Sequence, residues 1–412
     1  MSKVRTVLVI GGGIAGPVAA TALHKAGLQA TVYEAYPAAS KGIGSALALA
    51  PNGLAALGII DADAAVRAIA LPITGTAVSI AGRNIALPGL PDLPPLQMVD
   101  RGDLHRVLHD RATAVGARFE YGKRLVGVDE GLDGITARFS DDSTATADVL
   151  VGADGVRSTV RTLIDPNAPS ANYTGLLGFG GYVDADIPRA PGAMTFAFGT
   201  RAYYLYWAMP DGRIAWGANL PSKDYLTLTQ ARAIPAQDWL DALRATYAGD
   251  VPGEMLAERT TAQSLEVLGA IHIMPPVPHW HRGRMVLVGD AVHAPSNSTG
   301  QGASLAIESA IQIARCLRDL PDASSAFAAY EALRRARVEK ITKRGAKLNH
   351  AKTPGRVARK MMRLVMPIMF KAMNPEKTIG WEQRYTIDWE APVEKSRIVT
   401  TSTPDAMKGR AA

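Results

Sequence analysis

The 412-residue sequence contains a single cysteine, Cys316, and has no apolar run close to the roughly 20 residues that a helix needs to cross a bilayer. One cysteine excludes a disulfide framework and argues against a structural zinc cluster. Aromatic residues are few, at 6% of the chain, yet 47% of the residues are hydrophobic, as is ordinary for a globular protein. We therefore expect a cytoplasmic protein that holds no metal.

Acidic residues are nearly missing from one segment. Residues 334–371 hold 13 Lys and Arg but only one acid, Glu339, giving a net charge of +12 where the whole chain has +7. The rest of the chain is acidic, which argues against a nucleic-acid-binding protein. Apolar and basic residues alternate between Val357 and Met369, as in a helix on an anionic membrane or a helix packed on the protein. Pro367 interrupts the pattern, so we favour the packed helix over membrane contact.

A glycine-rich turn lies near the amino terminus, between a short apolar run and a helical pattern. Gly11 permits a tight turn, Gly13 lets the backbone approach a pyrophosphate, and Gly16 lets the helix pack closely on the strand. The start of the helix offers unpaired N–H groups to an anion. Glu34 ends the next predicted strand and is placed to accept hydrogen bonds from a ribose hydroxyl. The stretch predicts a dinucleotide site without distinguishing NAD from FAD.

Two later stretches also place a polar turn after a buried strand. The strand predicted at 148–151 leads into GADGVRSTVR, and the strand at 285–288 leads into Gly289 and Asp290. An acid at the carboxyl edge of a parallel sheet can bind polyol hydroxyls. Residues 300–302 then open a long helix, whose positive end would stabilise a reduced, anionic flavin.

The three motifs together resemble the FAD-dependent aromatic hydroxylase-like monooxygenases, the group with the p-hydroxybenzoate hydroxylase fold. The motifs are GGGIAG with Glu34, DGVRSTVR, and GDAVH followed by GQGASLAIESA, and the resemblance spans roughly residues 1–345. It implies an α/β fold: a Rossmann-like FAD/NAD(P)-binding domain, an inserted β-rich substrate domain and a C-terminal helical segment. The expected FAD-binding domain is 1–70, 96–170 and 277–345, the substrate domain 71–95 and 171–276, and the C-terminal segment and tail 346–412.

The resemblance also implies two sets of site residues. The FAD-binding residues would be Gly11, Gly13, Ile14, Ala15, Gly16, Glu34, Ala46, Arg101, Val126, Asp154, Gly155, Gly289, Asp290, Gly300, Gln301, Gly302 and Ala303. The substrate would be lined by Tyr182, Tyr206, Trp207, Trp216, Pro295 and Asn297. No side chain is assigned to catalysis, and for His293 we favour a structural role.

The implied activity is that of a monooxygenase with bound FAD and transiently bound NADPH or NADH. Reduced FAD and O2 would form a C4a-hydroperoxide that hydroxylates or epoxidises an aromatic, polyketide-like or other apolar organic substrate. The absence of a second complete GxGxxG unit fits transient nicotinamide docking. Two alternatives stay open: a flavin-dependent reductase of isoprenoid double bonds, and a non-catalytic flavin- or ligand-binding protein. A monomer or a homodimer is expected.

Overall fold

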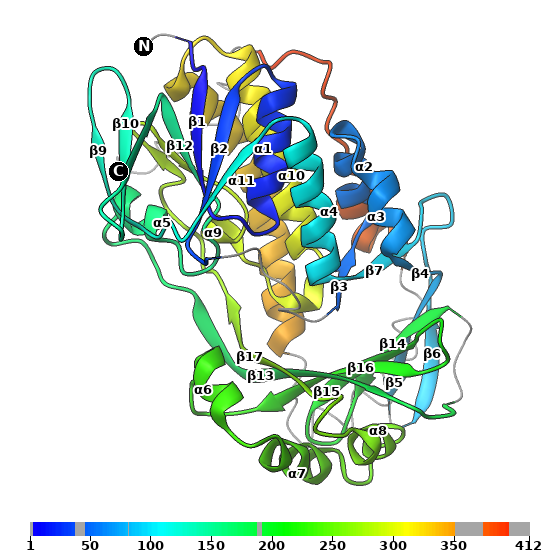
Figure 1. Ribbon diagram of the computed structural model, residues 1–412. Helices are drawn as coiled ribbons and strands as arrows, with labels where there is room; N and C mark the ends of the chain where they lie inside the picture. The colour runs from blue at the N-terminus through cyan, green and yellow to red at the C-terminus, as the bar shows by residue number, and fades with distance from the viewer. Residues whose placement is uncertain (1–2, 38–45, 81, 188–191, 351–373, 395–412) are drawn as a thin grey trace, which may run out of the picture.

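The apolar run near the amino terminus forms β1 (Thr6–Ile10), an inner strand of a six-stranded sheet in the computed structural model. Both neighbours of β1 are parallel to it, and burial of both sheet faces explains why its sequence does not alternate. The structure describes residues 3–37, 46–80, 82–187, 192–350 and 374–394 (Figure 1). In sheet order the strands are β18 (His281–Arg282), β19 (Met285–Leu287), β12 (Val149–Gly152), β1, β2 (Gln29–Glu34) and β8 (Arg118–Tyr121).

Helices cover this sheet, and five of them form a connected set of helix–helix contacts. α1 lies against α10 and α4, while α10 also packs on α2 and α11. Figure 1 shows α1, α4, α10 and α11 side by side over the sheet. The helices of this part are α1 (Ala15–Lys25), α2 (Pro51–Ile59), α3 (Asp63–Ile69), α4 (Arg101–Ala114), α5 (Thr159–Ile164), α9 (Asp290–His293), α10 (Gly302–Asp319) and α11 (Ala323–His350).

A seven-stranded sheet forms the lower layer of Figure 1, with three helices on its far side. Its strands, in sheet order, are β17 (Glu266–Ile273), β13 (Asn172–Val183), β16 (Ile214–Pro221), β15 (Tyr203–Ala208), β14 (Ala193–Phe198), β5 (Gly75–Ile80) and β6 (Arg83–Leu87). The helices are α6 (Leu228–Ala233), α7 (Ala236–Tyr247) and α8 (Gly253–Arg259). The α/β fold with a Rossmann-like sheet and a β-rich insertion is confirmed.

Two small sheets complete the described fold. One contains β9 (Leu125–Glu130), β10 (Ile135–Phe139) and β11 (Thr144–Ala147). The other contains β3 (Ala46–Leu49), β7 (Leu96–Asp100) and β4 (Leu71–Ile73). Short helical pieces η1 (Asn297–Thr299), η2 (Glu376–Gly380) and α13 (Trp381–Gln383) lie in the connections.

The structure differs from the sequence-based expectations at three places. The strand-like runs at 118–121, 125–128 and 135–139, with Gly and Asp turns between them, predict hairpin-like strands. The first run, β8, instead joins β2 in parallel because it follows a crossover helix, α4. The segment 71–95 is shared between two sheets, since β4 pairs with β7 whereas β5 and β6 join the large sheet. The last predicted boundary, at residue 346, falls inside α11.

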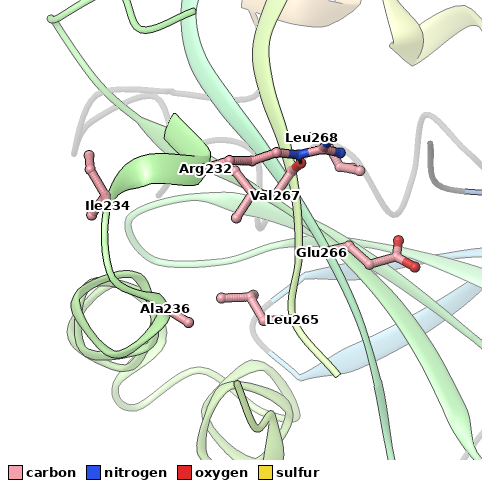
Figure 2. A pocket seen from close by; sticks show the side chains of 7 residues that line it. All are labelled: Arg232, Ile234, Ala236, Leu265, Glu266, Val267 and Leu268. Atoms are coloured by element: carbon pink, nitrogen blue, oxygen red, sulfur yellow. Dashed lines mark hydrogen bonds between the residues drawn. The ribbon is translucent and has the colours of Figure 1, made fainter. Parts of the chain in front are cut away.

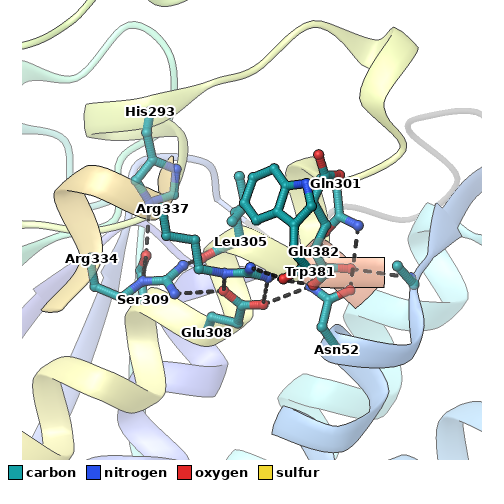
Figure 3. A network of polar contacts seen from close by, with 12 residues as sticks. Asn52, His293, Gln301, Leu305, Glu308, Ser309, Arg334, Arg337, Trp381 and Glu382 are labelled. Carbon is teal, nitrogen blue, oxygen red and sulfur yellow. Dashed lines mark hydrogen bonds and ion pairs between the residues drawn. The ribbon is translucent and has the colours of Figure 1, made fainter. Parts of the chain in front are cut away.

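A buried ionic cluster joins α10, α11 and the C-terminal segment (Figure 3). Glu308 on α10 lies 2.6 Å from Arg334 and 2.9 Å from Arg337, both on α11, and the Glu308 and Arg334 side chains are fully buried. The Arg337 guanidinium also donates to the carbonyl oxygen of Glu382, whose carboxylate pairs with Arg344. The alternating pattern at 357–369 lies outside the described residues. No helix within the described ranges is long and apolar enough to cross a membrane.

The Glu308 cluster predicts a large loss of stability on substitution. Burial opposes ionisation of Glu308, but Arg334 and Arg337 outweigh that effect and lower its pKa. We expect Glu308→Gln to cost about 3–5 kcal/mol in urea unfolding, because two arginines lose their buried partner. A lowered pKa stabilises the fold above the ordinary range of a glutamate, so the difference from the unaltered protein should shrink as the pH falls through the lowered value.

The matched control is Glu339→Gln on the same helix as the two arginines. Glu339 pairs with Arg335 at the surface, so its loss should cost less than about 1 kcal/mol. Equal losses for the two variants would show that the buried cluster contributes no more than a surface pair.

Candidate active site

The first and third glycine motifs meet at one point of close packing. Gly289 has φ +60°, and a Cβ there would lie 3.1 Å from the Cβ of Ala15 and 3.2 Å from the Cβ of Ala306. The start of α1, the turn after β19 and the first part of α10 are therefore in contact. The close approach requires small residues at all three places, and it puts the two helix starts on the same edge of the sheet.

The second motif adjoins the first at Gly11. A Cβ on Gly11, which has φ +104°, would lie 2.5 Å from the carbonyl oxygen of Ala153. The Arg161 guanidinium donates to the carbonyl oxygen of Ala291 at 2.8 Å, so the second motif also holds the third. Among the glycines of the first motif, Gly13 differs: a Cβ there would meet nothing within 4 Å. Gly16 is close to Gly11, whereas the backbone at Gly13 is open to a ligand.

Glu34 is held at the end of β2 by backbone donors. Its carboxylate accepts the N–H of Gly12 at 2.7 Å and the N–H of Tyr36 at 2.9 Å. The carboxylate keeps lone pairs for a further donor, as a ribose hydroxyl would supply. Val126 is the second residue of β9 and is 56% exposed. The turn that precedes β9 contacts the end of β2, because the N–H of Lys123 donates to the carbonyl oxygen of Glu34. Glu34 and Val126 thus belong to the same end of the site.

Asp154 has its hydrogen bonds inside its own loop. Its carboxylate accepts the Ser158 hydroxyl and the N–H of Val160 at 3.0 Å, and burial raises its pKa. The carboxylate therefore shapes the turn before α5. Gly155 has φ +76°, and a Cβ there would meet nothing within 4 Å. In this motif the backbone at Gly155 is therefore open to a ligand.

Asp290 and Arg101 form the charged centre of the site. Both side chains are accessible to solvent. Surrounding protein raises the pKa of the Asp290 carboxyl, and the positive charge of Arg101 opposes that rise. Arg101 starts α4, directly after Asp100, whose carboxylate accepts the N–H groups of Gly102 and Asp103. The two charges are close enough to interact, and they lie where three elements end.

The helices that face the site begin without a side-chain cap. α1, which starts after Ile14, and α10, which starts after Gln301, have no side-chain hydrogen bond at their N-caps, whereas α4 is capped by Asp100. Their first backbone N–H groups are therefore open to an anion. Gly300 lies beside β3, because a Cβ there would be 3.9 Å from the Cβ of Ala48. Ala46 is in the same strand, and Gly302 and Ala303 form the partly exposed first turn of α10.

A buried amide pair fixes the start of α10, and sequence reasoning missed it. The Asn52 side-chain amide donates to Gln301 Oε1 at 2.9 Å and to Glu308 Oε1 at 2.6 Å (Figure 3). The only signal in the sequence was a polar residue in the apolar pattern of α2. The His293 Nε2 contacts the Ser309 hydroxyl, and burial lowers the pKa of His293 to about 3, so a structural role stays our prediction for this residue.

The expected substrate-lining aromatics lie on opposite faces of the large sheet. Tyr182 and Trp207 belong to an apolar cluster with Met98 and Ala46, on the side of the β3–β7 sheet. Tyr206 and Trp216 point to the other face and pack on α7 and α8, and the Trp216 indole donates to Thr260. Successive residues of a strand alternate in direction, so neighbours cannot share a face. Tyr206 and Trp216 are therefore excluded from the substrate-lining set that we propose.

The loop residues of that set lie beside the start of α10. Pro295 is buried, and a Cβ on Gly302 would be 4.0 Å from its ring. Asn297 is exposed and begins η1. Both precede the turn that ends at Gly300.

A surface hollow of about 330 Å³ lies between α6, α7 and the edge strand β17 (Figure 2). It is lined by Arg232, Ile234, Ala236, Leu265, Glu266, Val267 and Leu268. None of the three motifs contributes to it, so we do not place the reaction there. In Figure 2 the Glu266 carboxylate points away from α7, whereas Leu265 faces that helix.

Comparison with known proteins agrees with this geometry. A model of the FAD binding domain family matches residues 5–345. The FAD-dependent urate hydroxylase of Klebsiella pneumoniae is 30% identical over 356 residues, which cover 82% of this chain and 88% of that protein. The aurachin C monooxygenase/isomerase of Stigmatella aurantiaca is 29% identical over 340 residues, or 80% and 85% of the two chains. The crystal structure of Klebsiella pneumoniae HpxO complexed with FAD and uric acid has a TM-score of 0.78 at 26% identity and covers 92% of this chain and 95% of its own.

The open backbone at Gly13 gives the first prediction for the site. Gly13→Val should fold normally, because nothing lies within 4 Å of the new Cβ, yet it should block the approach of a pyrophosphate. We expect at least a tenfold loss of FAD affinity, roughly 1.4 kcal/mol, read from flavin fluorescence, with little change in melting temperature. Gly89→Ala is the matched control, since Gly89 is equally open but lies far from the motifs in sequence. Full FAD occupancy in Gly13→Val would contradict the placement of the pyrophosphate.

The Asp290 carboxylate gives the second prediction. Asp290→Ala should sharply lower the FAD content of the purified protein while leaving its circular dichroism unchanged, because an exposed acceptor for ribityl hydroxyls is removed. Asp133→Ala, in an exposed turn, is the control and should retain its flavin. An unaltered flavin-to-protein ratio in Asp290→Ala would remove Asp290 from the site.

Proposed function

Because this chain belongs to the FAD binding domain family, we propose that it is an FAD-dependent monooxygenase that uses NAD(P)H and O2 to insert one oxygen atom into a small organic substrate. The observation that carries this proposal is the convergence of the three motifs: the first and third meet at Ala15, Gly289 and Ala306, and the second adjoins the first where Gly11 lies against Ala153. The reductase and the non-catalytic binding protein find no support among the relatives described above.

The residues present fit an FAD. Open backbone at Gly13 and Gly155, two uncapped helix starts, and the accessible Asp290 carboxylate supply donors and acceptors for a pyrophosphate and a polyol. When bound, FAD supplies the electron transfer and oxygen activation. We assign Gly11, Gly13 and Glu34 to the nucleotide end, and Arg101 and Asp290 to the flavin end.

The protein's own contribution is electrostatic and steric. In the proposed site the uncapped start of α10 would direct its N–H groups and positive dipole end at the part of the flavin that becomes negative on reduction. The Asn52–Gln301 pair keeps that helix start in place. The face of the large sheet that carries Tyr182 and Trp207 would exclude water from the reacting atoms.

We propose an aromatic or heteroaromatic substrate that is hydroxylated on its ring. Support comes from the urate hydroxylase, whose relative was crystallised with uric acid, and from the apolar cluster of Tyr182, Trp207 and Met98. Ring stacking on such a surface is the ordinary way to hold a planar substrate.

The activity is tested by measuring NADPH and NADH oxidation together with O2 uptake over a panel of phenols, N-heteroaromatics and quinolones. We expect one substrate class to stimulate oxidation and to give a product heavier by one oxygen atom. A yellow protein that consumes NAD(P)H but reduces its substrate without O2 uptake would favour the reductase. A protein that takes up no FAD would refute the proposal.

A further inference from the structure

Glu266 shares a sheet face with the apolar cluster that contains Tyr182 and Trp207. In the register of the large sheet Glu266 lies opposite Gly180, Gly180 opposite Gly217, and Gly217 opposite Leu205. Directly opposed residues of antiparallel strands point to the same face. Leu205 packs on the apolar cluster, so Glu266 faces the flavin side of the sheet and not α7.

The two glycines of this row create space in front of Glu266. A Cβ on Gly180 would be 2.9 Å from Glu266 Oε2, so the carboxylate lies flat over that glycine. Gly217 is on an inner strand yet is partly exposed, whereas its neighbours Trp216 and Ala218, on the opposite face, are buried. Gly180 is therefore buried under the carboxylate, and the partly exposed backbone at Gly217 forms a floor that has this carboxylate at its border.

Glu266 is also close to the charged centre of the site. Burial and the negative charge of Asp100 raise its pKa, and Asp100 directly precedes the flavin-side Arg101. The same two acids, Glu266 and Asp100, raise the pKa of Tyr182, after burial. Within the described residues, the Glu266 carboxylate has no hydrogen bond and no ion pair. The half-buried carboxylate therefore keeps lone pairs that a ligand donor could reach.

We propose that Glu266 is a specificity-determining residue, which accepts a hydrogen bond from an O–H or N–H group of an aromatic substrate lying on the floor at Gly217, beside the carboxylate. The ligand class is a neutral ring that carries such a donor. A purely apolar ring would leave the carboxylate unpaired. This inference rests on the proposed function, because it takes the ring to lie between this floor and the flavin.

The test uses the FAD-loaded full-length protein and two neutral probes, 2-naphthol and 2-methoxynaphthalene, in which a methyl group replaces the donor hydrogen. Dissociation constants are read from the perturbation of flavin absorbance. The unaltered protein should bind 2-naphthol at least about tenfold more tightly, as expected for a hydrogen bond to a charged acceptor. Glu266→Ala should abolish this preference, and Glu266→Gln should keep part of it.

Two further variants separate the hydrogen bond from general effects. Gly180→Ala should reduce the preference without removing the charge, because the new methyl group displaces the carboxylate. Glu258→Gln, an exposed acid on α8, is the charge-matched control and should retain the full preference. All variants should keep the FAD content of the unaltered protein.

Equal binding of the two probes by the unaltered protein, or binding of neither, would overturn the assignment. Retention of the preference in Glu266→Ala would overturn it as well. These outcomes are distinct from failure of the proposed function, which would appear as loss of FAD or as no oxygen transfer with any substrate in the panel.

Discussion

The contact of Ala15, Gly289 and Ala306 is the constraint on which the site depends. Ala15 is far in the sequence from Gly289 and Ala306, yet a Cβ on Gly289 would lie 3.1 Å from the Cβ of Ala15 and 3.2 Å from the Cβ of Ala306, which is closer than ordinary van der Waals contact. Only small residues permit this approach. Because α1 and α10 pack together here, their open N-termini are fixed relative to one another, and a long dinucleotide can then be held at both ends.

The Glu308 cluster extends that constraint to the end of the described chain. A carboxylate with two arginine partners is expensive to bury, but once paired it requires a unique arrangement of α2, α10, α11 and the segment after residue 374. One oxygen of Glu308 also accepts a hydrogen bond from Asn52, which in turn holds Gln301. The start of α10 is thus positioned by Asn52 and Glu308, which do not reach the flavin side themselves.

Much of this could be predicted from sequence because the information was local. A glycine turn after an apolar strand, followed by an acid at the end of the next strand, indicates a dinucleotide-binding turn within one stretch of the chain. Gly11, Gly13 and Glu34 are the example here. The partners of buried polar groups were not predictable in this way. Asn52 and Glu308 are 256 positions apart, and nothing near either residue indicates the other. The hairpin expected at 118–121 was wrong because strand-like composition does not distinguish a parallel neighbour from an antiparallel one.

The sheet face to which each strand residue points is harder to predict from sequence, and it determines which side chains can contact the substrate. Alternation shows that Tyr206 and Trp207 point in opposite directions, but only the packing of α7 and α8 shows which direction is the core. The aromatic residues, which attract attention in the sequence, largely fill that core. The face that we propose for the substrate carries Tyr182 and Trp207 but also Gly180, Gly217 and the Glu266 carboxylate, residue types that sequence reasoning treats as turns or solvent-exposed positions. Since glycine weakens a strand interior, two glycines side by side in the middle of a sheet are best explained by the need for space above them.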